Sequence, residues 1–296
     1  MKLLLTIVLL SLLFSCHNKS KDCGELIKGD WKSLKLDSFS TEAKPYTFCF
    51  EDSFCSVISP FFPFTKYSIT DDVLSVSMDS ATFFEEHYPS KYKILKVDND
   101  SLILQPISPV TTYKSIFRLG KIKPKNSLAP VMIYFRSSPC FGSCPSVMLE
   151  IDSTGRLLFF GKNQPDTGLL FKDSLNKTQY DIIIKKINNL ALDSLKEFYE
   201  AGWTDDQSCG INIITKDRKI NSTAYGYDKE PVELRLLFNY LMVLNKRLHL
   251  KATNNVDEAY FILNKDQQIL DHNPPPPAIP APIYKNKKIK AGRIRH

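Results

Sequence analysis

Residues 91–105, KYKILKVDNDSLILQ, carry the clearest structural signal in this chain. Lys91–Val97 alternates polar and apolar side chains apart from Leu95, which is the period of a half-buried β-strand, and Ser101–Gln105 is a short apolar run bounded by polar residues. Asn99 and Asp100 lie between the runs, where a tight hairpin turn favours such residues. The stretch therefore predicts two antiparallel strands joined by a short turn.

The same pattern extends on both sides of this hairpin, from Gly29 to Gly120. Short alternating runs are separated by turn residues such as Asp71 and Asp72, with no long helical period. The predicted strands are Trp31–Leu36, Tyr46–Phe50, Phe54–Ile58, Lys66–Thr70, Val73–Met78, Lys91–Val97, Ser101–Gln105 and Thr112–Leu119. Such a series predicts a small antiparallel β-barrel or sandwich over residues 25–120.

Residues 121–130, KIKPKNSLAP, interrupt the alternation and are the predicted linker. Residues 131–252 then combine strand and helix patterns, which predicts an α+β domain. The predicted strands are Val131–Arg136, Val147–Asp152, Arg156–Gly161, Ile211–Thr215 and Lys219–Tyr225, and the predicted helices are 176–190 and 231–250. The expected fold class is thus mixed, with a small antiparallel β-barrel followed by an α+β domain. Residues 253–296 form a proline-rich and basic tail.

The N-terminus predicts export. Lys2 precedes an apolar run, Leu3–Phe14, that is too short for a membrane-spanning helix and has the proportions of a secretory signal. Leu13-Phe14-Ser15-Cys16 resembles the lipobox of bacterial lipoproteins. The resemblance implies that residues 1–16 are a lipoprotein signal ending in a lipidated Cys16. Acyl chains on Cys16 would attach the protein to a membrane of the cell envelope, expected to be the outer membrane. Residues 17–24 are the predicted tether.

The net charge of +7 is concentrated at the end of the chain. The tail Lys285–Arg295 contains Lys285, Lys287, Lys288, Lys290, Arg293 and Arg295 and no acidic residue. Without the tail and Lys2, basic and acidic residues balance, which argues against a nucleic-acid-binding face. The tail is predicted to be solvated, and binding to an anionic surface is the alternative.

Cysteines in an exported chain can form disulfides. After Cys16 the chain contains Cys23, Cys49, Cys55, Cys140, Cys144 and Cys209. Cys49 and Cys55 flank the segment FEDSF, which could be the tip of a hairpin, so a disulfide between them is favoured over two inert thiols.

Gly29-Asp30-Trp31 opens the first predicted strand, and Phe117-Arg118-Leu119 closes the last. Together they resemble the lipocalin superfamily. The resemblance implies a barrel in which Trp31 packs under Arg118 at one end, held by cation–π contact and hydrogen bonds. Small barrels are usually filled by their own side chains, so a filled interior is favoured over a site for a small apolar ligand.

Cys140-Phe141-Gly142-Ser143-Cys144-Pro145 is the most distinctive motif. It resembles the C-F-G-x-C-P signature of an uncharacterised domain family found in bacterial envelope lipoproteins. The resemblance extends over Leu128–Leu250, including the segment Trp203-Thr204-Asp205, and implies a fold with no established activity. Trp203 is predicted to be a packing residue at the edge of the domain, and Asp205 and Asp206 to be solvated turn residues.

Three hypotheses compete for Cys140 and Cys144. A structural disulfide closing a tight loop is favoured. A redox pair is the second, although redox dithiols usually have two residues between the cysteines and lie at a helix N-terminus. The third is a Cu(I) site, because C-x3-C-P also resembles copper chaperones of the thioredoxin fold. Met148 and Cys209 could then add soft ligands.

The sequence contains no familiar catalytic motif: G-x-S-x-G, H-E-x-x-H, the P-loop and the Rossmann fingerprint are all missing. The histidines lack metal-ligand spacing; they are His17, His87, His249, His272 and His296. We therefore expect a non-enzymatic module without cofactor or metal, which binds a small apolar ligand or an envelope protein and is held at the membrane by Cys16. Thiol-redox or Cu(I) handling by Cys140, Cys144 and Cys209 is the alternative, and a purely structural envelope protein is a third possibility.

Overall fold

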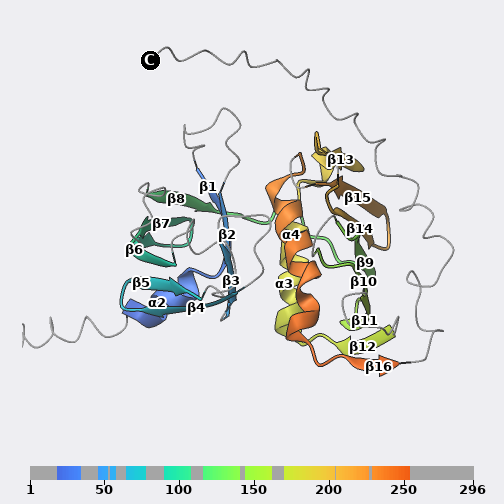
Figure 1. The fold of residues 1–296 in the computed structure, drawn as a ribbon, viewed down its shortest axis with the longest axis horizontal. Coiled ribbons are helices and arrows are strands. Elements are labelled where there is room, and N and C mark those ends of the chain that lie inside the picture. Colours follow the sequence, from blue (N-terminus) through green and yellow to red (C-terminus); the bar gives the residue numbers. More distant parts are fainter. Residues whose placement is uncertain are drawn as a thin grey trace, which may run out of the picture.

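The computed structural model of the chain shows a mixed, β-rich fold (Figure 1). An antiparallel barrel of eight strands is followed by a second region that is mostly sheet, with few helices among the described residues. The structure describes residues 19–34, 46–52, 54–57, 65–77, 90–107, 116–140, 144–161, 170–203, 205–226 and 229–253.

The prediction of antiparallel strands over residues 25–120 is confirmed, and they close into a barrel rather than a sandwich. Closure occurs because β1 pairs with β2 on one side and with β8 on the other. The strands are β1 (Gly29–Ser33), β2 (Thr47–Glu51), β3 (Phe54–Val57), β4 (Thr65–Thr70), β5 (Val73–Val76), β6 (Lys91–Val97), β7 (Ser101–Pro106) and β8 (Phe117–Lys121).

Aromatic side chains occupy the barrel interior. The Phe48 ring contacts three others, with its centroid 6.2 Å from that of Phe50, 6.0 Å from that of Tyr92 and 5.5 Å from that of Phe117. All four residues are buried, as is Trp31. Phe48 stacks on Phe50 and meets Tyr92 and Phe117 edge to face, and such ring packing adds to the free energy gained by burying the apolar area. The barrel core is therefore built from the chain's own side chains.

A helix, α2 (Lys19–Leu26), precedes the barrel where residues 17–24 were predicted to be a tether. Ile27 follows it and is fully buried in the barrel core. The backbone oxygen of Ile27 also accepts a hydrogen bond of 2.7 Å from the indole nitrogen of Trp31. These contacts tie the end of the helix to the barrel, and the tether over residues 17–24 stays a prediction that must include the first turns of this helix. Cys16 lies outside the described residues.

The second region is built on a sheet with the order β13-β15-β14-β9-β10-β11-β12-β16. Its strands are β9 (Met132–Ser137), β10 (Val147–Asp152), β11 (Arg156–Gly161), β12 (Leu170–Ser174), β13 (Phe198–Glu200), β14 (Ser208–Ile214), β15 (Lys219–Tyr225) and β16 (Lys251–Thr253). The sequence patterns predicted β9, β10, β11, β14 and β15. They missed β12, β13 and β16, which are short or lack a clear alternation.

Two longer helices, α3 (Lys177–Asn188) and α4 (Val232–Met242), pack on one face of this sheet. Asn176 and Gln179 form a capping box at the start of α3, because each side chain bonds the backbone N–H of the other. The helix predicted over 231–250 ends early, since α4 stops at Met242 and a 3-10 turn, η3 (Leu244–Arg247), follows. Another 3-10 turn, η2 (Leu192–Ser194), follows α3.

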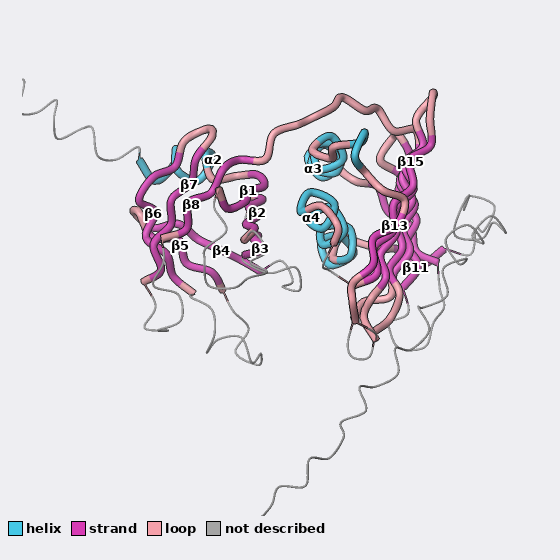
Figure 2. The backbone as a smooth tube through the Cα atoms, turned by 90° about the horizontal axis from the view of Figure 1, so that it is seen from above, coloured by secondary structure: helices cyan, strands magenta, loops and turns pink. Residues whose placement is uncertain are grey.

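The helices form a middle layer between the sheet and the barrel (Figure 2). Leu236 and Val232 of α4 pack against Cys49 of β2 and Ile122, so α4 contacts apolar groups on both of its sides. None of the helices in the described ranges has the length and apolar character needed to cross a bilayer.

Candidate functional site

The predicted disulfide between Cys140 and Cys144 is present, with a Cα–Cα distance of 5.5 Å. It closes the connection between β9 and β10. Ser137, the last residue of β9, donates a hydrogen bond of 2.7 Å from its hydroxyl to the carbonyl oxygen of Pro145. The disulfide and the hydrogen bond from Ser137 to Pro145 therefore hold the two ends of the loop together.

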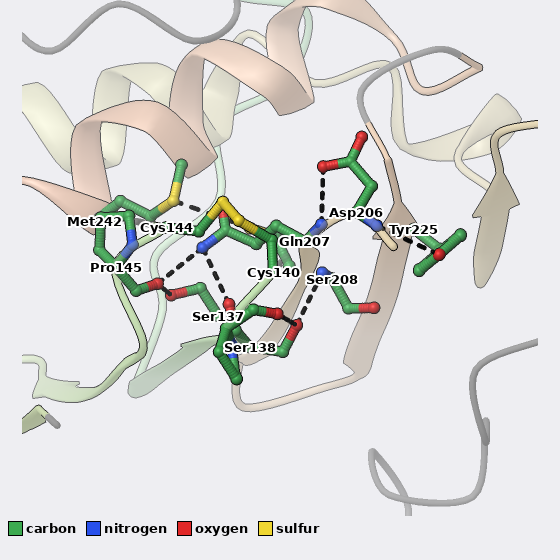
Figure 3. The surroundings of a disulfide bond; sticks show 12 residues. Ser137, Ser138, Cys140, Cys144, Pro145, Asp206, Gln207, Ser208, Tyr225 and Met242 are labelled. Carbon is green, nitrogen blue, oxygen red and sulfur yellow. Dashed lines mark hydrogen bonds between the residues drawn. A yellow bond between two sulfur atoms is a disulfide. The ribbon is translucent and has the colours of Figure 1, made fainter. Parts of the chain in front are cut away.

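Gln207 connects this loop to the neighbouring strand (Figure 3). Its side-chain nitrogen donates to the carbonyl oxygens of Ser138, at 3.0 Å, and Pro145, at 2.6 Å. One residue precedes the disulfide and the other follows it, so a single buried amide bridges both arms of the loop. The backbone N–H of Ser208 adds a bond of 2.9 Å to the hydroxyl of Ser138. This network fixes the loop against the start of β14.

Trp203 lies in the turn that leads into Gln207. Its indole nitrogen donates to Asp206 Oδ2 at 2.8 Å, and Asp206 Oδ1 accepts from the backbone N–H of Gln207 at 2.7 Å. Gly226 packs beneath the turn at a φ of +65°, and a side chain there would approach Ala201 and the Trp203 indole. Only glycine adopts this backbone conformation at low cost and leaves room for the indole.

We name Cys140, Cys144, Trp203, Asp206 and Gln207 the disulfide–Trp203 surface. Trp203 is 41% exposed, so the prediction that it is a packing residue is only partly met. Asp206 was predicted to be a solvated turn residue; it is instead half-buried and positions the indole. The sequence motif pointed to the loop, but no local pattern pointed to Gln207.

The ligand set proposed for Cu(I) is not assembled. Met148 packs with Tyr134 and Leu158 on one face of the sheet, whereas Cys209 belongs to the cluster on the helix-covered face. The Cys209 thiol is fully buried and lies 3.9 Å from the Met242 sulfur. Among the described residues, no group of three or more histidine, cysteine, aspartate or glutamate side chains is arranged to hold a metal ion.

The favoured disulfide between Cys49 and Cys55 is wrong, since both are free thiols. In the register of the β2–β3 hairpin, Cys55 faces Phe50 and Cys49 faces Ser56. A shift of one residue sends the two side chains to opposite faces. Cys55 points into the barrel core, where burial raises the pKa of its thiol to about 12, and Cys49 points toward α4.

Trp31 is fully buried in the barrel as expected, but its cation is not Arg118. The side chain of Arg118 alternates outward between buried Phe117 and Leu119 and is exposed. The ammonium of Lys121 lies 4.8 Å from the Trp31 ring centroid instead, and it donates to the carbonyl oxygen of Leu26. Burial lowers the pKa of Lys121. Barrel closure by Arg118 is therefore wrong, and Lys121 takes this position.

A second polar cluster, which the sequence patterns missed, lies between the barrel and the helices. We name Asp30, Cys49, Glu51, Lys186 and Arg247 the interface charge cluster. Lys186 of α3 is buried, with its ammonium 2.7 Å from Asp30 Oδ1, 3.4 Å from Glu51 Oε1 and 3.3 Å from the Cys49 sulfur. Arg247 reaches Glu51 Oε2 at 2.6 Å. Two carboxylates thus meet two cations at the interface.

The charges of this cluster depend on one another. Burial alone would lower the pKa of Lys186, but the carboxylates of Asp30 and Glu51 raise it well above its ordinary value. Burial also raises the pKa of the Cys49 thiol, so that it stays protonated. Buried ion pairs of this kind require both partners, because removing one leaves an uncompensated charge. The cluster therefore holds the barrel on the helices.

Glu233 of α4 forms a smaller contact at the same interface. Its Oε1 accepts from the ammonium groups of Lys32, at 3.1 Å, and Lys125, at 2.9 Å. Burial would raise the pKa of Glu233, but these bonds lower it below its ordinary value. Lys125 also lines a cleft of about 330 Å³ with Ser194 and Arg218. Exposed linker and turn residues make up much of its wall.

Residues 131–245 match a family described as "Domain of unknown function (DUF6438)". The matched segment begins just before β9 and ends within η3, so it contains the whole disulfide–Trp203 surface. It does not include the barrel. No curated protein matches this chain.

Proposed function

We propose that this protein is a lipid-anchored component of the bacterial cell envelope that binds another envelope protein through the disulfide–Trp203 surface, without catalysis. Cys16, at the end of Leu13-Phe14-Ser15-Cys16, would carry the lipid. The barrel would be lipocalin-like with a filled interior, and the second region would be an α+β domain.

The main support for this proposal is the pair of hydrogen bonds that the Gln207 side-chain amide donates to the disulfide loop. This bridge joins both arms of the disulfide loop to the turn that presents Trp203. A rigid, partly exposed tryptophan is the kind of side chain that dominates protein–protein binding energy. Because hydrogen bonds already hold Trp203, Asp206 and Gln207 to one another, binding through these side chains would lose little conformational entropy.

Thiol-redox and Cu(I) functions receive less support. The Cys140–Cys144 disulfide leads into strand β10, whereas catalytic thiols depend on a helix N-terminus or a nearby cation. Met148 lies on the opposite face of the sheet from Cys209. A binding role therefore agrees best with the arrangement of these residues.

Site-specific photocrosslinking in cells tests the binding proposal. A photoreactive amino acid at Asp205, which is exposed beside Trp203, is expected to capture one defined protein. The same group at Asp217, in the exposed turn between β14 and β15, is the matched control. Capture should decrease strongly when Trp203→Ala or Gln207→Ala is added. Equal capture from Asp205 and Asp217, or capture unaffected by these changes, would contradict the proposal.

Membrane fractionation tests the anchor separately. Wild-type protein is expected in the envelope membrane fraction with acyl chains on Cys16, and Cys16→Ser is expected in the soluble envelope fraction. Cys23→Ser is the control, because Cys23 lies after the predicted lipidation site. An unmodified Cys16 in the purified membrane-bound protein would disprove the lipid anchor.

A further inference from the structure

The sheet of the second region has another face, which turns away from α3 and α4 (Figure 2). We name it the outer sheet face. Strand register places Glu150 between Tyr134 and Leu158 on this face, and Asn212 on the other side of Tyr134. Within the described ranges, the apolar cluster of the outer sheet face comes from strands of the sheet itself: Met132, Tyr134, Met148, Leu158, Phe160, Leu170 and Ile214.

The centre of the outer sheet face is too deeply buried for a face left in water. Tyr134 is 1% exposed, Leu158 is 2% exposed and Asn212 is 4% exposed. Side chains stand away from a sheet, so neighbouring strands cover their flanks but leave their ends in contact with solvent. A further layer is therefore needed over this face.

A buried acceptor indicates the chemistry of this layer. The side-chain oxygen of Asn212 is buried and accepts no hydrogen bond from the described residues. A polypeptide segment that crosses the face brings backbone N–H groups that can donate to such an oxygen, whereas a lipid chain brings none. The outer sheet face therefore fits a polypeptide better than an apolar ligand.

The chain leaves the sheet beside this face. Thr253, the last residue of β16, pairs with Leu170 of the apolar cluster. The next apolar run is Tyr260-Phe261-Ile262-Leu263, which begins seven residues later. Seven extended residues span about 23 Å, whereas the four strand spacings from β16 to β9 amount to about 19 Å. The run is therefore within reach of Tyr134 on β9.

The charges along this path are complementary. Lys172 of β12 and Lys251 of β16 pair in register on the outer sheet face and are exposed. Asp257 and Glu258 lie between β16 and the apolar run. Opposite charges at the edge of the face would favour a segment that returns across it.

We propose that residues 257–263 of this chain dock on the outer sheet face, with the apolar run over Tyr134 and Leu158 and the two carboxylates near Lys172 and Lys251. The sheet then has α3 and α4 on one face and a segment of its own chain on the other. This docking is independent of the proposed binding function, and it closes the outer sheet face to a partner protein.

Photo-methionine provides a direct test, because a diazirine replaces the thioether of methionine with little change in size. Met132 and Met148 lie on the outer sheet face, and Met242 of α4, in the cluster under the helices, is the internal control. Illumination of the full exported protein is expected to link position 132 or 148 to a peptide that contains residues 257–263. Position 242 should not link to it. Links from positions 132 and 148 that never include this peptide would overturn the proposal.

An equal mixture of unlabelled and isotopically labelled protein identifies the copy that supplies the segment. A link within one chain carries a single label, whereas a link between two chains carries both. We expect single-label links to residues 257–263. Mixed-label links to this segment would overturn the proposal in favour of a second copy of the chain.

Charged substitutions in the apolar run make the test specific. Phe261→Asp combined with Ile262→Asp puts a carboxylate on each side of an extended segment, so one must face the sheet whichever side packs. The links to this segment should then be lost, because burying a carboxylate without a cation is unfavourable. Ile279→Asp with Ile283→Asp, farther along the chain, is the matched control and should keep them. Links that persist in Phe261→Asp/Ile262→Asp would contradict the docking of this run.

Discussion

The interface charge cluster and the disulfide–Trp203 surface are both rich in polar contacts, but they differ in what completes them. In the cluster, Lys186 and Arg247 are matched by Asp30 and Glu51 of the same chain, all inside the interface. At the surface, Trp203 donates its N–H to Asp206 of the same turn, and its side chain is 41% exposed. The dense set of buried charges belongs to the docking of the barrel on the helices, whereas the partly exposed aromatic side chain is the basis of the proposed binding role.

The largest effect is expected from a substitution that disrupts the interface charge cluster. Lys186→Met removes the buried ammonium that pairs with Asp30 and Glu51, so Asp30 loses its cation and Glu51 is left with Arg247. We expect the free energy of unfolding, measured by urea denaturation, to fall by about 3–5 kcal/mol. Lys177→Met, at a side chain that is 88% exposed, is the control and should have little effect. Equal stability of the two variants would show that the cluster does not hold the interface.

The next effect concerns the rigidity of the surface. Replacing Cys140 and Cys144 together by serine opens a short loop, which should reduce the free energy of unfolding by about 2 kcal/mol. Reducing the disulfide of the wild-type protein should lower its melting temperature by as much as the double serine substitution does. Cys23→Ser, at a free cysteine, is the matched control. If reduction leaves the melt unchanged, the disulfide contributes nothing to the stability of the loop.

The ionisation of Glu233 predicts how the stability of the interface depends on pH. Its pKa is lower in the folded protein than its ordinary value of 4.5, so the unfolded state binds the proton more readily. The stability it contributes is present above pH 4.5 and is lost as the pH falls below this value. Denaturation between pH 3 and pH 6 should show a weaker pH dependence in Glu233→Gln. An identical dependence in both proteins would contradict the ionised contact with Lys32 and Lys125.

The smallest expected effect is at the tryptophan of the surface. Trp203→Ala should lower the free energy of unfolding by about 1 kcal/mol, because 41% of the side chain is already exposed and the hydrogen bond that is lost lies at the surface. Trp31→Ala, in the barrel core, should reduce it by about 3–5 kcal/mol. The two variants compared by urea denaturation distinguish a binding tryptophan from a packing one. A similar loss of unfolding free energy in the two variants would show that Trp203 is a packing residue like Trp31.

The barrel was predictable because its signal is local. Two short strand-like runs, Lys91–Val97 and Ser101–Gln105, with the turn residues Asn99 and Asp100 between them, need no information from distant residues. The disulfide between Cys140 and Cys144 was predictable for the same reason, since a loop this short brings both sulfurs together. Strand β16 was not, because so short an edge strand depends on its pairing with β12.

Two predictions failed because strand register decides which face of the sheet a side chain occupies. Cys49 and Cys55 point to opposite faces because Phe50, not Cys49, pairs with Cys55. Lys121 rather than Arg118 lies over Trp31, since alternation in β8 turns Arg118 outward. The lipocalin resemblance indicated that a basic residue lies over Trp31. It did not indicate which way each basic side chain of the strand points.

The sequence by itself determined the strands of the barrel, the two longer helices and the cysteine loop. Each depends on residues a few positions apart, where periodicity and turn chemistry act directly. The tertiary structure decided the meeting of Asp30 and Glu51 with Lys186 and Arg247, and the bridge from Gln207 to the disulfide loop. These contacts join segments far apart in the chain, so they exist only after strand register and the docking of the helices are set.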